Sequence, residues 1–181
     1  MPWRNGGGVT RELLAWPDPH DWLLRASVAD IHASGPFSKF PGVDRWFAVL
    51  AGGAVSIETA GAAPRELTAA HTALHVFPGD AETYCTALGV ATRDFNLMAR
   101  RGRVRLRQRP LRDSALLETT AAGAGLFVTQ ATTVGEDSGP VATLPAMALA
   151  WWENPQRQRR VLRAAAGEVR GWWFEVETDC H

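Results

Sequence analysis

Short apolar segments separated by turn-forming residues run along most of the sequence. The segments are rich in β-branched, aromatic and leucine side chains, and Gly, Pro and Asp interrupt them at close spacing. This spacing is typical of an all-β sandwich or barrel. Few stretches show the apolar period of a long helix. We therefore expect an all-β protein.

Two predicted strands, at residues 24–29 and 94–98, carry polar side chains on one face only. Successive side chains of a strand point to opposite faces, so alternate residues share a face. The polar-face positions are Arg25 and Ser27 in the first strand and Asp94, Asn96 and Met98 in the second. Asp30 continues the other face of the first strand, which Ala26 and Val28 occupy.

Turn signals predict two hairpins in this half of the chain. Residues 45–50, headed by Arg45, form a strongly β-prone run that ends at Gly52-Gly53. We expect residues 55–58 to return beside this run as its hairpin partner. We also expect residues 73–77 and 83–87 to pair about the turn Pro78-Gly79-Asp80.

The second half of the chain repeats this style. Its predicted strands lie at residues 104–109, 125–131, 141–144, 146–151 and 171–177. A boundary within residues 111–120 divides the chain into an N-terminal half, 1–110, and a C-terminal half, 111–181. We expect the two halves to pack as one compact unit.

Composition and charge narrow the possible functions. Apolar residues make up 46% and charged residues 21%, as in ordinary globular proteins, which excludes wholesale disorder. The formal net charge is zero, which argues against a general nucleic-acid or membrane-surface role. Cys85 and Cys180 lie too far apart for a disulfide framework, and no apolar run suits a signal peptide or a membrane span. We expect a cytoplasmic protein.

Three consecutive glycines, Gly6 to Gly8, form the most distinctive local feature. Glycine lets the backbone approach a ligand closely and offer its N–H groups without hindrance. The segment is neither a phosphate-binding Walker loop nor a dinucleotide fingerprint, because it lacks Gly-Lys-Ser/Thr and a preceding strand. Two interpretations stay open: a ligand-binding backbone segment and a flexible terminal tail.

Four motifs occur in the same order as in a known family. They are residues 2–12 (PWRNGGGVTRE), 27–31 (SVADI), 35–45 (GPFSKFPGVDR) and 94–98 (DFNLM). On these motifs the sequence resembles the HutD/Ves family of the RmlC-like jelly-roll superfamily. The resemblance implies a cupin-like bicupin, with two antiparallel β-sandwich or barrel halves in one chain. Members usually carry about a strand's length of chain before the Pro-Trp motif, which leaves the ordering of the glycine segment open.

The resemblance also implies a function. The family is associated with bacterial histidine utilisation, where members are thought to bind a small acidic intermediate such as formylglutamate and to restrain the pathway. We therefore expect a non-catalytic protein whose partner is a small acidic metabolite, without nucleic acid, membrane or cofactor. The alternative is a metal-independent cupin-like enzyme, an isomerase or hydrolase acting on a small carboxylate.

Metal binding and nucleophilic catalysis find little support in the sequence. Cupins commonly bind metals through closely spaced histidines and a carboxylate, but no His-x-His occurs, and His71 and His75 lack suitably spaced carboxylates. Glu82 falls near the position of a later cupin histidine. No Gly-x-Ser-x-Gly elbow is present, and no base lies beside either cysteine in sequence. We expect neither a metal site nor catalytic residues.

The polar faces predict a ligand pocket in the first half. Arginine holds carboxylates through a planar fork of donors, so Arg45 or Arg25 is expected to bind an acidic ligand. Aromatic walls are expected from Phe37, Trp46 and Phe95. The predicted ligand-binding residues are Asn5, Gly7, Thr10, Arg25, Ser27, Phe37, Arg45, Asn96 and Met98. Alternatively, either arginine forms a structural ion pair with Asp30, Asp44 or Asp94.

Residues 100–112 are rich in arginine and contain no acid. Arg103, Arg105, Arg107 and Arg109 alternate with other residues, which places them on one strand face. An anion-binding surface is one interpretation. We favour a solvent-facing strand whose like charges discourage edge-to-edge pairing, because aromatic stacking residues are absent from the segment.

Two tryptophan pairs, Trp151-Trp152 and Trp172-Trp173, stand out in the second half. On a strand, one indole of each pair faces the core and the other faces outward, so the outer rings could form a homodimer contact. Packing within the fold is the favoured alternative.

Overall fold

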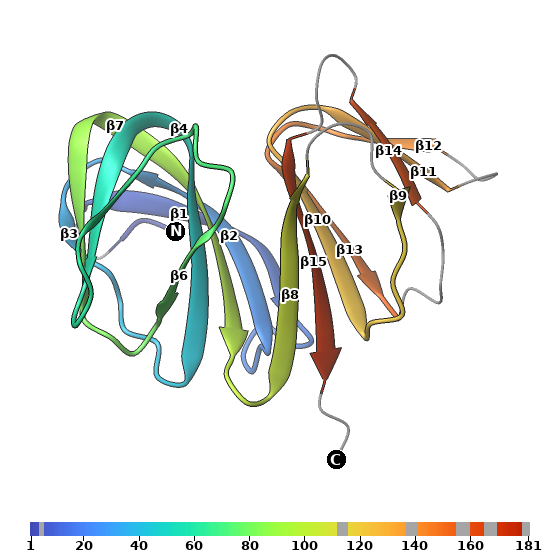
Figure 1. The fold of residues 1–181 in the computed structure, drawn as a ribbon, viewed down its shortest axis with the longest axis horizontal. Helices are drawn as coiled ribbons and strands as arrows, with labels where there is room; N and C mark the ends of the chain where they lie inside the picture. Colours follow the sequence, from blue (N-terminus) through green and yellow to red (C-terminus); the bar gives the residue numbers. More distant parts are fainter. Residues whose placement is uncertain (4–5, 112–115, 137–140, 155–159, 165–169, 179–181) are drawn as a thin grey trace. The chain divides into compact units, whose positions relative to one another are not determined.

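The computed structural model describes residues 1–3, 6–111, 116–136, 141–154, 160–164 and 170–178, and the described residues form an all-β protein without helices (Figure 1). No helix in these ranges could therefore cross a membrane. The chain divides into two compact units, Met1–Arg101 (unit 1) and Gly102–His181 (unit 2).

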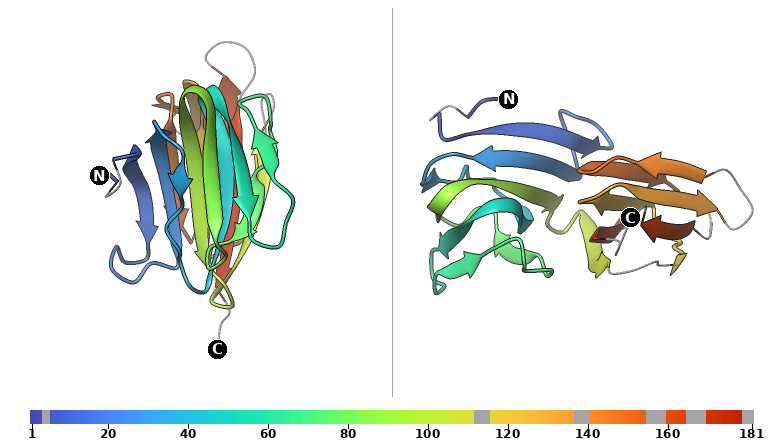
Figure 2. Two further views of the ribbon diagram at one scale, coloured as in Figure 1. Left: turned by 90° about the vertical axis from the view of Figure 1, so that its left-hand side faces the viewer. Right: turned by 90° about the horizontal axis from the view of Figure 1, so that it is seen from above.

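Unit 1 contains one sheet of seven strands. Its central path runs β1-β2-β7-β4-β5, with β3 added on β7 and β6 on β4. Figure 2 shows β1, β2, β7 and β4 side by side in this order. The strands are β1 (Gly8–Trp16), β2 (Leu24–Ile31), β3 (Gly35–Pro36), β4 (Val43–Thr59), β5 (Arg65–Leu67), β6 (His75–Pro78) and β7 (Thr83–Arg100).

Both predicted hairpins of unit 1 are wrong. Residues 45–58 belong to the single strand β4, because Gly52-Gly53 forms bulges rather than a turn: the register against β7 shifts between Val49 and Ala51 and again between Gly52 and Ala54. A side chain at Gly52 would collide with the backbone oxygen of Ala91. Strands β6 and β7 both pair with β4 and not with each other. β4 and β7 therefore run as two long, curved neighbours (Figure 1).

An apolar cluster fills part of the interior of unit 1. Its buried members are Ile31, Phe47, Val49, Val55, Ile57, Leu67, Phe77 and Cys85, and Trp3 and Phe37 pack against it. Phe47 and Val49 alternate with Ala48 on β4, so the side chains that build this cluster share the strand face that carries Arg45. One face of the sheet thus carries both the apolar cluster and the predicted polar positions.

Unit 2 contains two four-stranded sheets, ordered β13-β10-β15-β8 and β12-β11-β14-β9. Its strands are β8 (Val104–Leu111), β9 (Leu116–Leu117), β10 (Gly123–Val128), β11 (Thr132–Glu136), β12 (Val141–Leu144), β13 (Ala148–Glu153), β14 (Arg160–Ala164) and β15 (Gly171–Thr178). A core that includes Leu117, Leu126 and Trp173 draws residues from both sheets. Strands β8, β10, β12, β13 and β15 correspond broadly to the five expected from the sequence, whereas β9, β11 and β14 were not foreseen.

The arginine-rich segment forms the edge strand β8. Arg105, Arg107 and Arg109 are exposed, and Arg107 pairs with Glu177 of the neighbouring strand at 3.0 Å. This placement matches the solvent-facing interpretation of the segment.

The tryptophans of unit 2 depart from the alternating arrangement. Trp172 and Trp173 are both buried, at 5% and 2% exposure; Trp172 stacks on Phe127, and Trp173 packs against Trp152. Trp151 and Trp152 are half-buried. Neither ring of the second pair therefore faces outward, and a homodimer stays a prediction.

Candidate functional site

The centre of the candidate site is a set of cross-strand rows on one face of the unit 1 sheet. β7 lies between β2 and β4, so its residues from Thr92 to Ala99 face one neighbour on each side. The rows are Arg25–Met98–Arg45, Ser27–Asn96–Phe47 and Ala29–Asp94–Val49. Residues directly opposite each other on antiparallel strands share a face. The structure therefore brings together the polar faces that the sequence predicted on separate strands.

These rows form one wall of a cavity of about 480 Å³. The segment that leads from β3 into β4 covers part of it, held by hydrogen bonds from Phe37 N to Thr83 O and from Phe40 N to Gly79 O. The lining residues are Met1, Pro2, Trp3, Thr10, Arg25, Ser27, Ala29, Pro36, Phe37, Ser38, Phe40, Arg45, Asp94, Asn96 and Met98. Of the predicted ligand-binding residues that the structure describes, all except Gly7 line this cavity.

The N-terminal segment is built into the wall of the cavity. Gly7 is buried, and its carbonyl oxygen accepts hydrogen bonds from His32 N at 2.8 Å and Ala33 N at 3.3 Å. Trp3 donates its indole N–H to Thr10 Oγ1 at 2.7 Å. The described part of this segment is therefore not a free tail, and Gly7 supports the cavity wall without lining it. Asn5 lies outside the described residues.

Gly8 allows this arrangement. A side chain at Gly8 would collide with the carbonyl oxygen of Asp30 and press on the Trp3 ring. The glycine run thus serves close packing between the N-terminal segment, β2 and an aromatic wall of the cavity.

Arg45 is a buried cation that faces the cavity and forms no ion pair with any described residue. Its side chain lies among the rings of Phe37, Phe77 and Phe40, with guanidinium-to-centroid distances of 4.8, 5.0 and 5.7 Å. Its hydrogen bonds, from Nε to Asn96 Oδ1 and from Nη1 to Ser38 O, are both long at 3.4 Å. Burial lowers the pKa of Arg45 to about 10, so it remains charged at neutral pH.

Arg25 is already engaged by an acid. Its Nε lies 2.6 Å from Glu12 Oε2 of the neighbouring strand β1. This partner was not foreseen. Two of the three acids proposed as partners pair elsewhere: Asp30 pairs with Arg93 at 2.7 Å, and Asp44 with Arg101 at 2.7 Å. Of the two candidate arginines, Arg45 is therefore the better placed for an incoming anion.

Asp94 is the least expected group of the cavity. It is 2% exposed, and its Oδ2 has no hydrogen-bond partner among the described residues. Burial raises the pKa of Asp94 well above the usual aspartate range, although the positive charge of Arg45 acts in the opposite direction. Its strand face was predictable, but its burial among apolar residues was not.

The aromatic walls differ in part from those expected. Phe37 lines the cavity, but Trp46 and Phe95 do not; the actual aromatic lining is completed by Trp3 and Phe40. Phe95 follows Asp94 on β7, so alternation turns its ring to the opposite face. Trp3 and Phe40 come from irregular segments, where no sequence period indicates the direction of a side chain.

The described residues contain no group of three or more His, Cys, Asp or Glu side chains that could hold a metal ion. His71 lies in an exposed turn, where Thr68 N donates to its Nδ1 at 3.1 Å. His75 stacks on Phe77, and burial lowers its pKa. Glu82 is exposed and pairs with Lys39 at 2.9 Å.

Comparison with known proteins identifies relatives over most of the chain. The HutD family model matches residues 1–169. Protein Ves of Cronobacter sakazakii is 32% identical over 163 residues, covering 90% of this chain and 86% of that protein. An uncharacterized 21.2 kDa protein in the hutC 3′ region of Pseudomonas putida is 36% identical over 131 residues, covering 70% of this chain and 67% of that protein.

Solved structures agree with this relationship. The crystal structure of a conserved protein of unknown function from Pseudomonas aeruginosa PAO1 aligns with a TM-score of 0.87 at 31% identity, covering 98% of this chain and 93% of that one. A cupin 2 conserved barrel domain protein from Leptotrichia buccalis aligns with a TM-score of 0.58 at 10% identity, covering 94% and 89%. At that identity the likeness concerns the fold alone, which is cupin-like. On the family model and the Ves relative, the chain belongs to the HutD family.

Proposed function

We propose that this protein binds a small acidic metabolite in the unit 1 cavity and acts as a non-catalytic sensor or buffer. The observation that carries the proposal is Arg45: a buried guanidinium that faces a cavity of about 480 Å³ and makes only two long hydrogen bonds. Guanidinium groups bind carboxylates through short, charge-assisted hydrogen bonds. A ligand carboxylate would supply the partner that the described protein residues do not.

The rest of the lining fits a small carboxylic acid. Ser27, Asn96 and Thr10 offer hydrogen-bonding groups, whereas Trp3 and Phe37 provide apolar walls. Ligand sites commonly combine a few polar groups with apolar walls in this volume range. The lining is therefore suited to a ligand with one carboxylate at Arg45 and a short polar remainder.

Family membership directs the choice of ligand. Membership of the HutD family, and a Pseudomonas putida relative described from a hutC region, support a link to histidine utilisation. We therefore propose formylglutamate as the ligand, and restraint of that pathway as the consequence of binding. A cytoplasmic location is part of this proposal.

The two units also suggest a bicupin. The cupin-like fold and the division into two compact β units support an origin as two cupin-like halves in one chain. The ligand site proposed here belongs to the N-terminal half alone, because all lining residues lie within residues 1–101.

Calorimetry tests the proposal. N-formylglutamate is titrated into the protein and into Arg45→Gln, with N-formylglutamine as a ligand that replaces one carboxylate with an amide. We expect Arg45→Gln to lose about a hundredfold in affinity, because charge-assisted hydrogen bonds contribute about 1.5–3 kcal/mol. The matched control is Arg103→Gln, since Arg103 is an exposed arginine of unit 2; its affinity should stay within about twofold of the parent.

Two outcomes would count against the proposal. Equal affinity in a folded Arg45→Gln variant would remove Arg45 from the site. No binding of N-formylglutamate, glutarate or N-formylglutamine by the parent protein would remove the ligand class itself.

A further inference from the structure

Asp94 lines the same cavity as Arg45, and one of its two carboxyl oxygens has no hydrogen-bond partner among the described residues. Asp94 lies one cross-strand row from Asn96, the acceptor of the Arg45 Nε bond, on the same strand face. Its exposure is 2%, and its Oδ2 makes no hydrogen bond to any described residue. A buried polar atom left unsatisfied costs about 1–3 kcal/mol, so such an atom on a side chain that lines a cavity indicates a role beyond folding.

The charges that face Asp94 come from every strand packed beside it. Of the cations, Arg45 on β4 has the largest electrostatic effect on the pKa of Asp94: it lowers this pKa and so favours the ionised form. On β2, Asp30 acts in the opposite direction, although it is held by Arg93, and Arg25 is neutralised by Glu12 of β1. On β7 itself, Cys85 is a neutral thiol, because burial and the proximity of Asp94 raise its pKa to about 12.

Ionised Asp94 would work against an acidic ligand. Two carboxylates placed in one low-dielectric site repel each other, and a charged Asp94 would cancel the attraction exerted by Arg45. A neutral carboxylic acid has the opposite effect: it leaves the charge of Arg45 unopposed, and its O–H is a donor to a carboxylate oxygen. Paired acid and carboxylate groups sharing one proton are well known where carboxyls meet in proteins.

We propose that Asp94 binds the ligand as a neutral carboxylic acid, donating its O–H hydrogen bond to the ligand carboxylate that Arg45 also holds. The proposal rests on the proposed function and specifies its chemistry: the site recognises a monoanionic carboxylate between a guanidinium and a carboxylic acid. The proton stays on Asp94 and no covalent bond changes. The upward displacement of the pKa of Asp94 by burial agrees with this state.

The pH dependence of binding follows directly. The affinity for the ligand is highest at pH values where Asp94 is protonated in the free protein. It falls as the pH rises above the pKa that Asp94 has in the free protein. Each pH unit above that point lowers the affinity by up to tenfold, because binding must then take up one proton. Titration of a lining histidine does not contribute to this pH dependence, since no histidine is among the residues that line the cavity.

Infrared difference spectroscopy of the parent protein is the first test. N-formylglutamate is added at about pH 7, where free carboxylic acids are ionised. We expect the complex to show a protonated-carboxyl C=O band that is absent from the complex of Asp94→Asn. Absence of this band from the parent complex would overturn the role of Asp94 without any variant having to fold.

Calorimetry on variants is the second test. Asp94→Asn keeps an N–H donor, so we expect it to lose less than about tenfold in affinity and to bind independently of pH between about pH 5 and pH 9. Asp94→Ala keeps no donor and should lose about a hundredfold at the low end of this range. An Asp94→Asn variant as weak as Asp94→Ala would overturn the proposal.

The outcomes separate this inference from the function on which it rests. If the parent protein binds N-formylglutamate without a protonated carboxyl band, only the role of Asp94 fails. If the parent binds neither N-formylglutamate nor glutarate at any pH in the range, the proposed function fails, and the role of Asp94 fails with it.

Discussion

The proposed ligand site explains the positions of Arg45 and Asp94 better than folding alone does. Both are ionisable and buried, with exposures of 4% for Arg45 and 2% for Asp94. The described residues satisfy their hydrogen-bonding atoms poorly. Burying charged or unpaired polar groups lowers the free energy of unfolding. Residues that weaken the fold without compensation tend to mark functional sites. Substitution of either side chain should therefore weaken ligand binding but raise the free energy of unfolding.

Asp94→Asn should stabilise the protein at neutral pH. The folded pKa of Asp94 is raised above its unfolded value, so the parent loses stability as the pH rises from the unfolded to the folded pKa. The amide does not titrate, so the advantage of the variant should grow by up to about 1.4 kcal/mol per pH unit within that window. Urea unfolding at several pH values measures this difference.

Asp30→Asn is the matched control for that experiment. The hydrogen bond from Arg93 lowers the pKa of Asp30, so the contribution of Asp30 to stability is present above its unfolded pKa and lost as the pH falls. Its removal should not stabilise the protein at neutral pH. If the free energies of unfolding of Asp94→Asn and of the parent changed in parallel with pH, Asp94 would not be protonated in the folded protein.

Among the elements, the N-terminal segment links the glycine run to the cavity. Trp3, Gly7 and Gly8 connect β1 with the end of β2 through packing and backbone hydrogen bonds. The position of the Trp3 ring in the cavity wall therefore depends on Gly8, although Gly8 has no side chain that could contact a ligand.

Gly8→Ala should damage both the fold and the site. The added methyl group collides with Asp30 O and with Trp3, so we expect a loss of about 1–3 kcal/mol in the free energy of unfolding. Displacing Trp3 should also weaken N-formylglutamate binding. Val9→Ala, at a 43% exposed neighbour, should stay within about 0.5 kcal/mol. Similar unfolding energies for Gly8→Ala and Val9→Ala would contradict the close packing.

The sequence could predict the faces of β2 and β7, because alternation along an isolated strand fixes which side chains point the same way. It could not predict the long strands. Gly52-Gly53 suits both a turn and a bulge, and only pairing with β7 decides between them. Nor could it predict Glu12 as the partner of Arg25, since a bulge between Glu12 and Leu14 alters the register of β1.

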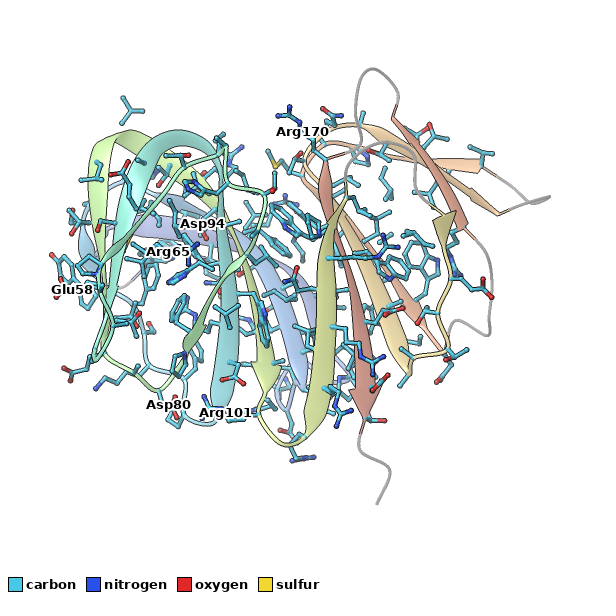
Figure 3. All side chains as sticks on the ribbon, viewed as in Figure 1. Glu58, Arg65, Asp80, Asp94, Arg101 and Arg170 are labelled. Atoms are coloured by element: carbon cyan, nitrogen blue, oxygen red, sulfur yellow. The ribbon has the colours of Figure 1, made fainter. Side chains whose placement is uncertain are left out.

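For the whole molecule, the two compact units differ in what their interiors hold. The interior of unit 1 combines an apolar cluster with a polar cavity, and Figure 3 shows Asp94 within this unit, apart from the Asp80–Arg101 pair at its rim. In unit 2, the described core that includes Leu126 and Trp173 is apolar, and the buried Arg160 lies beside it with its guanidinium 4.5 Å from the Trp152 ring. The candidate site thus lies within unit 1.

Nuclear magnetic resonance can test this asymmetry. Titration with N-formylglutamate should shift amide signals of β2, β4, β7 and residues 36–40, because these segments line the cavity. Signals of β10 and β15 should stay in place, since neither strand contributes a lining residue. Comparable shifts in β10 and β15 would contradict a site confined to unit 1.

The cross-strand rows also limit how this site can evolve. Asp94, Asn96 and Met98 reach the cavity only because Phe95 and Leu97 point the other way. Point mutations at the three lining positions can alter ligand preference while the neighbouring apolar residues stay packed. An insertion or deletion of a single codon between them would exchange the two sets, placing apolar side chains in the cavity and an acid and an amide on the opposite face. New specificities in this lineage should therefore arise by substitution along β7, with length changes confined to the connecting loops.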